Sequence, residues 1–191
     1  VSLKTAALLK QQEEDKLLQR WLPLVGHDPA YNTNLSLRSR HFDIGYDSEM
    51  SWRPTKTATM PQLLLHHSDT YGCGHYRMLQ PLYAMQKEGK AQGHAFLSLL
   101  NLGEVAPYRP DSLIIQRRYA PAFHSWIERT TKLPDMFKVF ELDDYILNLP
   151  MKHYNRVNFS QEVSGHLRKS LSYFDRFVVS TPPLAESLAT F

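Results

Sequence analysis

The sequence predicts an α/β protein with a parallel sheet of about five strands, preceded by a helix and a long irregular segment. Three observations support this fold class. From residue 62 onward, short apolar runs alternate with segments that carry apolar residues at helical spacing, which is typical of a parallel sheet covered on both faces. The first run leads into a glycine-bracketed polar loop and then into a helical segment, as in doubly wound domains. Polar residues follow four of the five runs.

The first third of the chain is expected to lie outside the sheet. Residues 2–22 predict a helix whose middle is highly charged and whose apolar residues gather near its ends. Residues 23–61 are rich in Pro, Asn, Ser and Asp, which favour turns, so this segment is interpreted as a connector or as a wrap over the domain surface. The predicted organisation is therefore an N-terminal helix and irregular connector over 1–61 and one Rossmann-like domain over 62–191.

The elements of the predicted domain alternate in type. Strands are expected where apolar residues are continuous, and helices where apolar residues recur every three to four positions. Proline at position 81 and the pair at 182 and 183 suit the first turn of a helix. The expected strands cover 62–66, 94–100, 112–116, 137–142 and 176–180, and the expected helices cover 78–87, 121–132, 160–174 and 182–191.

Composition limits the classes of function. The 191 residues are 42% hydrophobic and 12% aromatic, enough for one full domain with a core and an appendage. The net charge is only +3 and the basic residues are scattered, which argues against a nucleic-acid partner. Cys73 is the single cysteine, which favours a reducing compartment. No apolar run is long enough to span a bilayer, and the charged start does not resemble a signal peptide. Both ends look as if cut from a longer protein.

Polar residues at the ends of four predicted strands form the candidate site. Right-handed crossovers place these loops on one edge of a parallel sheet, where ligands of doubly wound domains bind. Considered one at a time, Arg117 and Arg118 are typical of solvated surface charges, and Thr181 is typical of a helix N-cap. The groups are Gly72–Arg77, whose glycines let backbone N–H groups approach a ligand, then Gln116-Arg117-Arg118, Asp143-Asp144 and Ser180-Thr181.

The acidic pair Asp143-Asp144 leaves several roles open. Two carboxylates at a strand end can hold a divalent metal on a sugar-nucleotide, accept hydrogen bonds from substrate hydroxyls, or serve as a general base. Either residue can also cap the following turn. A zinc site built from His66, His67 and His75 beside Cys73 is disfavoured, because neighbouring strand residues point to opposite faces and the spacing is wrong for a tetrahedral set.

Four segments together resemble the N-terminal half of a bacterial GT-B glycosyltransferase of the type that builds O-antigen and other surface glycans. The resemblance covers about residues 24–191 and implies two Rossmann-like domains that face each other across a cleft. In that arrangement the N-terminal domain receives the acceptor and the C-terminal domain holds most of the nucleotide-sugar. The segments are GCGHYRMLQPL at 72–82, LIIQR at 113–117, ELDDY at 141–145 and FVVSTPPLA at 177–185.

The resemblance implies the acceptor-side half of a hexosyltransferase-like enzyme that moves a sugar from a nucleotide-sugar to a glycan or protein acceptor. Asp143 and Asp144 would bind acceptor hydroxyls, one of them as the base, with no metal and no cofactor. The donor would bind mainly a second domain beyond residue 191, so these residues alone are expected to fold but not to transfer sugar. The substrate-binding residues implied are Gly72, Gly74, His75, Arg77, Arg117 and Thr181. The implied location is the cytoplasm or the inner face of the cytoplasmic membrane, with peripheral membrane contact at most.

Two alternatives stay open. One is a non-catalytic, flavodoxin-like binding or scaffolding domain. The other is a GT-A enzyme with Asp143 and Asp144 as metal ligands, although residues 1–60 supply no strand of the kind that opens a nucleotide-binding domain.

Overall fold

Five strands form one parallel sheet in the order β2-β1-β3-β4-β5, so the predicted α/β, Rossmann-like fold class is confirmed. The chain steps from β1 to β2 in one direction and continues from β3 to β5 in the other. The topological switch point therefore lies between β1 and β3, which pair with each other. The strands are β1 (Gln62–His66), β2 (Gln92–Phe96), β3 (Ser112–Gln116), β4 (Phe137–Leu142) and β5 (Arg176–Val179).

The computed structural model describes residues 3–25, 28–32, 34–35, 44, 59–133, 135–146 and 161–189. Most of the irregular segment predicted for 23–61 lies outside these residues, as do the predicted helix ends at 2, 160 and 190–191. The chain divides into two compact units, one of Val1–Arg53 with Leu100–Arg109 and one of Pro54–Leu99 with Pro110–Phe191. No helix among the described residues combines the length and hydropathy needed to cross a bilayer.

The first unit holds α1 (Leu3–Val25), α3 (Leu102–Val105) and the 3₁₀ turn η3 (Ala106–Tyr108). The sequence predicted a helix at 2–22 but no helix near 102. A capping box starts α3: Asn101 Oδ1 accepts the Glu104 N–H at 3.0 Å, and Glu104 Oε2 accepts the Asn101 N–H at 2.7 Å. These two bonds satisfy the first orphan amides and make a helix of only four residues possible.

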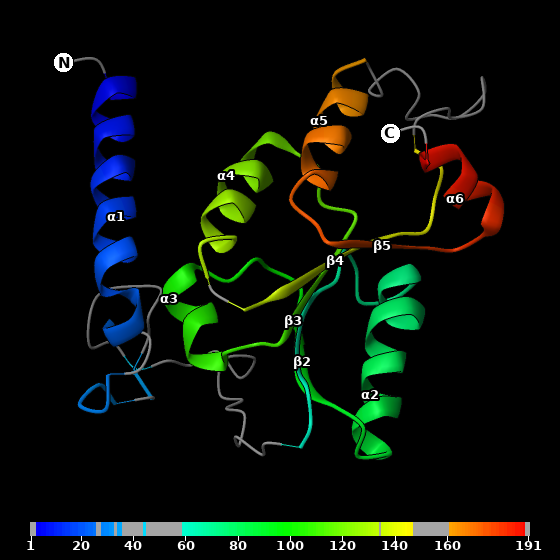
Figure 1. Cartoon of the computed structure of the whole chain (residues 1–191), viewed down its shortest axis with the longest axis horizontal. Helices are drawn as coiled ribbons and strands as arrows, with labels where there is room; N and C mark the ends of the chain where they lie inside the picture. Colours follow the sequence, from blue (N-terminus) through cyan, green and yellow to red (C-terminus); the bar gives the residue numbers. More distant parts are fainter. Residues whose placement is uncertain are drawn as a thin grey trace. The chain divides into compact units, whose positions relative to one another are not determined.

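Helices cover both faces of the sheet in the second unit. Figure 1 shows α2 (Gln80–Lys87) on one side, and α4 (Pro121–Thr130) and α5 (Gln161–Leu171) side by side on the other. On the α2 side, Leu65, Met78 and Leu82 form a buried cluster. On the other side, the Phe174 ring lies 5.1 Å from that of Phe140 and 6.3 Å from that of Phe123. Two-sided burial explains the continuous apolar strands.

Two elements begin earlier than the sequence predicted. The strand expected at 94–100 is Gln92–Phe96, which pairs along its whole length with β1. Gly93 pairs with Leu63 so closely that a Cβ at Gly93 would lie 2.3 Å from the Leu63 carbonyl oxygen. Because glycine has a low β-strand propensity, the sequence did not predict that β2 includes Gly93. The helix expected from residue 78 is preceded by a π-helical turn, η2 (His75–Leu79). The last helix, α6 (Pro182–Leu188), starts as predicted.

Candidate functional site

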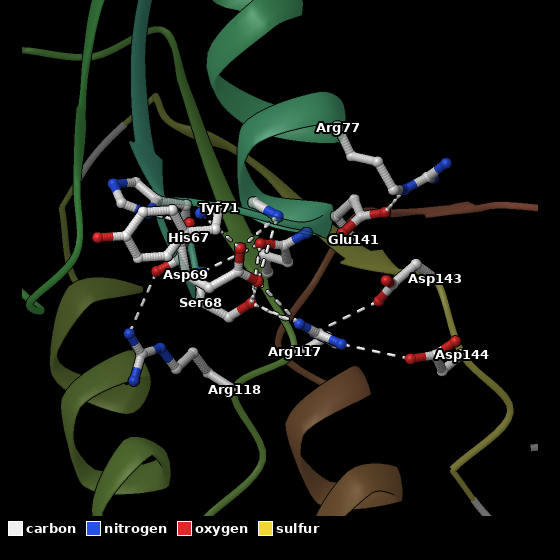
Figure 2. A network of polar contacts seen from close by, with 12 residues as sticks. His67, Ser68, Asp69, Tyr71, Arg77, Arg117, Arg118, Glu141, Asp143 and Asp144 are labelled. Carbon is white, nitrogen blue, oxygen red and sulfur yellow. Dashed lines mark hydrogen bonds and ion pairs between the residues drawn. The ribbon is translucent and has the colours of Figure 1, made fainter.

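The loops that follow β1, β3 and β4 meet at the carboxyl edge of the sheet, around the guanidinium of Arg117 (Figure 2). Ser68 and Asp69 come from the loop after β1, Arg117 from the loop after β3, and Asp143 and Asp144 from the end of β4. This position is the switch point of the sheet, where doubly wound domains bind their ligands. We call these five residues the rim cluster.

Arg117 is fixed by four side chains. Its Nη2 donates to Asp69 Oδ2 and to Ser68 Oγ, both at 3.0 Å, and its Nη1 donates to Asp144 Oδ2 at 3.3 Å. Its Nε lies 3.3 Å from Asp143 Oδ1. The backbone of Arg117 has a left-handed φ of 50°, a conformation that costs a non-glycine residue about 1–3 kcal/mol. The Arg117 N–H, bonded to the Glu141 carbonyl at 3.0 Å, helps to hold it there. This arginine is therefore an organised centre and not a loose surface charge.

The two acidic residues differ sharply in exposure. The Asp143 side chain is 5% exposed, and no nitrogen or hydroxyl of the described residues donates a hydrogen bond of good geometry to it. The Asp144 side chain is 66% exposed. Two effects raise the pKa of the Cys73 thiol to about 11: the larger is its interaction with the Asp143 carboxylate, and the smaller is burial. The structure thus leaves Asp144 open to a ligand, holds Asp143 behind Arg117, and keeps Cys73 protonated at neutral pH.

The glycine-bracketed loop is filled by the protein's own Asp69. The Gly74 N–H donates to both Asp69 carboxylate oxygens at 3.2 Å, and the Tyr71 N–H donates to Oδ1 at 3.1 Å. A Cβ at Gly74 would lie 1.9 Å from the Asp69 carbonyl oxygen, whereas one at Gly72 would meet nothing closer than 3.9 Å. The Gly74 amide, which was expected to face a ligand, therefore bonds to Asp69, as does the neighbouring amide of Tyr71. Ser68 and Asp69 were not among the predicted site residues, although an Asp two residues before a loop amide is the signal of an Asx turn.

A buried polar row runs beneath the rim cluster from β1 to β4. Gln116 Oε1 accepts the Ser68 N–H at 3.0 Å and the Ser68 hydroxyl at 2.9 Å. Gln116 is paired in register with Glu141, and the Glu141 carboxylate receives the Nε–H of Arg77. Burial raises the pKa of Glu141, while hydrogen bonds from Arg77 and Gln116 oppose that rise. The row links three strand ends to the π-helical turn that carries Arg77.

Besides Gly74 and Arg77, three further residues expected in the site lie outside the rim cluster. His75 contacts the Gln80 amide at 3.3 Å and packs edge-on against Tyr76. Thr181 accepts the Leu184 N–H at 3.4 Å as the cap of α6, although its neighbour Ser180 donates to the Asp143 carbonyl at 2.6 Å. The Gly72 carbonyl accepts the Tyr76 N–H at 3.1 Å.

His66, His67 and Arg118 contact other parts of the protein and lie outside the rim cluster. His66 is buried, with its ring 5.4 Å from that of Trp126 and 6.0 Å from that of Phe96. His67 contacts the Asp69 carbonyl through Nδ1 at 2.8 Å. Arg118 donates to the carbonyls of His67 and Leu97, and so ties the ends of β1 and β2 together. Within the described ranges, no group of three or more His, Cys, Asp or Glu residues is arranged to hold a metal ion.

Comparison of the chain with protein-family models gives no match, and comparison with curated proteins gives none. Among solved structures, the chain is similar to a pilus assembly-related protein from Burkholderia pseudomallei. The two are 12% identical, with a TM-score of 0.39, over 72% of this chain and 93% of the other. A likeness this distant supports no inference about function.

Proposed function

We propose that the chain is the acceptor-side domain of a GT-B glycosyltransferase, which moves a sugar from a nucleotide-sugar to a glycan or protein acceptor. The observation that carries the proposal is the rim cluster: an exposed carboxylate and an oriented arginine at the switch point of a doubly wound sheet. Carboxylates that accept hydrogen bonds are suited to sugar hydroxyls. The motif resemblance at the same strand ends supports this interpretation.

The different exposures divide the acidic pair into two roles. Asp144, 66% exposed, accepts the proton of the acceptor hydroxyl. The hydroxyl oxygen then bonds to the anomeric carbon of the donor as the bond from that carbon to the nucleoside diphosphate breaks. Asp143, 5% exposed, holds Arg117 and does not touch the acceptor. Ser68 and Asp69 complete the shell that fixes Arg117. The donor would be held by a second domain of similar fold.

Saturation-transfer NMR on the 191-residue chain tests the acceptor-side assignment. Oligosaccharides from bacterial surface polysaccharides should receive saturation, and nucleotide-sugars should bind weakly at most, because most donor contacts belong to the second domain. Asp144→Asn should weaken oligosaccharide binding. The control Glu88→Gln, an exposed carboxylate at the end of α2, should not. Tight, stoichiometric binding of a nucleotide-sugar to this chain, or no glycan binding at all, would refute the assignment.

A non-catalytic binding domain is the second candidate, and the strand order favours it. The order β2-β1-β3-β4-β5 is that of flavodoxin-like domains, many of which bind ligands or partners without group transfer. Glycan binding that persists in Asp144→Asn, with no transfer by a protein that carries both domains, would support this candidate. The GT-A alternative has less support, because Arg117 already pairs with both Asp143 and Asp144 and a divalent ion would have to displace it.

A further inference from the structure

We propose that Arg77 binds an anionic group of the acceptor, a carboxylate or a phosphate, and that Glu141 is the positioning residue that orients it. The inference rests on the proposed function and deepens it, since it names an acidic glycan as the acceptor class. Arg77 lies in the π-helical turn η2, and such turns occur often at functional sites.

Only one of the three guanidinium nitrogens of Arg77 bonds to another described residue. Its Nε donates to Glu141 Oε1, whereas Nη1 and Nη2 bond to no other residue in the part of the chain that the structure describes. Figure 2 shows these two terminal nitrogens directed away from Glu141. The Arg77 side chain is 27% exposed. Two adjacent terminal amino groups form the fork that binds a carboxylate or phosphate through paired hydrogen bonds.

Glu141 provides a rigid base for this fork. Its side chain is 3% exposed on a central strand, beside Gln116, which is itself fixed by two hydrogen bonds with Ser68. A buried ion pair generally adds little stability over an apolar pair, so stability alone gives a weak reason for a buried glutamate here. A guanidinium held through Nε has fewer rotamers to lose when it binds an anion, which favours binding.

The two arginines of this edge differ in how far they are neutralised. Among the residues that the structure describes, Arg117 faces three carboxylates, from Asp69, Asp143 and Asp144, whereas Arg77 faces one. The partners of the two arginines, Glu141 and Asp143, are two residues apart at the carboxyl end of β4, so both arginines belong to one stretch of the edge. This stretch therefore has an acidic end suited to hydroxyls and an end where the two charges cancel, at which the terminal amino groups of Arg77 are open to an anion. A sugar that carries an acidic group presents both.

The experiment is an NMR titration of the ¹⁵N-labelled chain with glucuronate, inorganic phosphate and neutral glucose. We expect glucuronate or phosphate to bind and to shift the Arg77 Nε–Hε signal. Arg77→Gln should weaken that binding about tenfold or more, the size expected for lost hydrogen bonds to a charged group. The matched control is Arg176→Gln, which removes the same charge at the start of β5, on the opposite edge of the sheet, and should leave binding within about twofold.

Two Glu141 variants separate orientation from charge. Glu141→Gln keeps an acceptor for the Arg77 Nε and removes a negative charge, so anion binding should be equal or stronger. Glu141→Leu removes the acceptor, so binding should weaken although a negative charge is again lost. Equal gains in both variants would overturn the positioning role. The Nε–Hε signal reports the orientation of Arg77 in each folded variant, and thermal melts identify any variant that does not fold.

The titration also separates this inference from the proposed function. Glucose binding as strong as glucuronate binding, or equal losses in Arg77→Gln and Arg176→Gln, would overturn the anion site and leave glycan binding intact. Phosphate binding at Arg77 without binding of any glycan would overturn the acceptor-side assignment and leave the anion site. Glucuronate preferred over phosphate would identify a sugar acid as the group, and the reverse preference would identify a phosphate.

Discussion

Replacing Gly74 with alanine should destabilise the sheet unit, whereas the same change at Gly72 should not. A Cβ at position 74 would lie 1.9, 2.8 and 3.1 Å from the carbonyl oxygen, the carbonyl carbon and the nitrogen of Asp69. All three are backbone atoms, so no rotamer change relieves the clash. The loop must move, and the bonds from the Gly74 N–H to the Asp69 carboxylate at 3.2 Å are lost.

The magnitude follows from these two effects. Overpacking costs about 1–3 kcal/mol, and a lost hydrogen bond to a charged group costs about 1.5–3 kcal/mol. We therefore expect Gly74→Ala to lower the free energy of unfolding by about 2.5–6 kcal/mol, which for a protein of this size lowers Tm by roughly 5–24 °C. At Gly72 the nearest atom to an added Cβ is Asp69 Oδ1 at 3.9 Å, so Gly72→Ala should be neutral or stabilising by about 0.4–1 kcal/mol.

Thermal and urea unfolding followed by circular dichroism measure both variants against the wild type. The m-value should stay unchanged, because the surface exposed on unfolding is the same. A Gly74→Ala variant as stable as the wild type would show that Asp69 does not pack against residue 74 as closely as described. Equal destabilisation of both variants would show that flexibility of the whole loop, and not one close approach, is what glycine supplies.

Three further predictions concern ionisation. Because the Cys73 pKa is about 11, iodoacetamide should alkylate this thiol slowly at pH 8, and Asp143→Asn, which removes the main cause, should raise the rate roughly tenfold, as measured by mass spectrometry. Arg77→Gln leaves the Glu141 carboxylate buried without its cation, so it should lower the free energy of unfolding by about 3 kcal/mol at pH 7, the low end for a buried pair because Arg77 is 27% exposed. This loss should shrink as pH falls through the pKa of Glu141, and a pH-independent loss would contradict it. Burial lowers the pKa of His124 in the folded protein, so its contribution to stability should be fully present above the unfolded value near 6.5 and lost as pH falls below it; urea titrations of His124→Gln should show a flatter dependence over that range.

The sequence was sufficient to predict the sheet and the edge on which the candidate site lies. The bounds of β1, β3 and β4 match the apolar runs, because strands buried on both faces leave a continuous apolar signal. The right-handed crossovers of a parallel sheet then place Arg117 and Asp143 on one edge without further information. The start of β2 was predicted wrongly, because the place of Gly93 in a strand depends on how closely β1 approaches.

The internal order of the candidate site could not be predicted from the sequence. The pairing of Gln116 with Glu141 depends on the register between β3 and β4, which follows from the fold and not from either segment. The left-handed φ of Arg117 has no local signal, because arginine is an unusual residue there. Asp143 and Asp144 are neighbours in sequence and both pair with Arg117, yet one side chain is 5% exposed and the other 66%.

The most direct test of the acceptor-side assignment is the turnover of Asp144→Asn in a protein that carries this domain together with its donor-binding domain. We expect kcat for sugar transfer to fall about 10²–10⁴-fold, the usual contribution of a positioned acid–base group, while calorimetry shows the Kd for the nucleotide-sugar unchanged. A kcat near that of the wild type would contradict the role of Asp144. Activity that disappears with a chelator and returns with manganese would contradict the GT-B assignment itself.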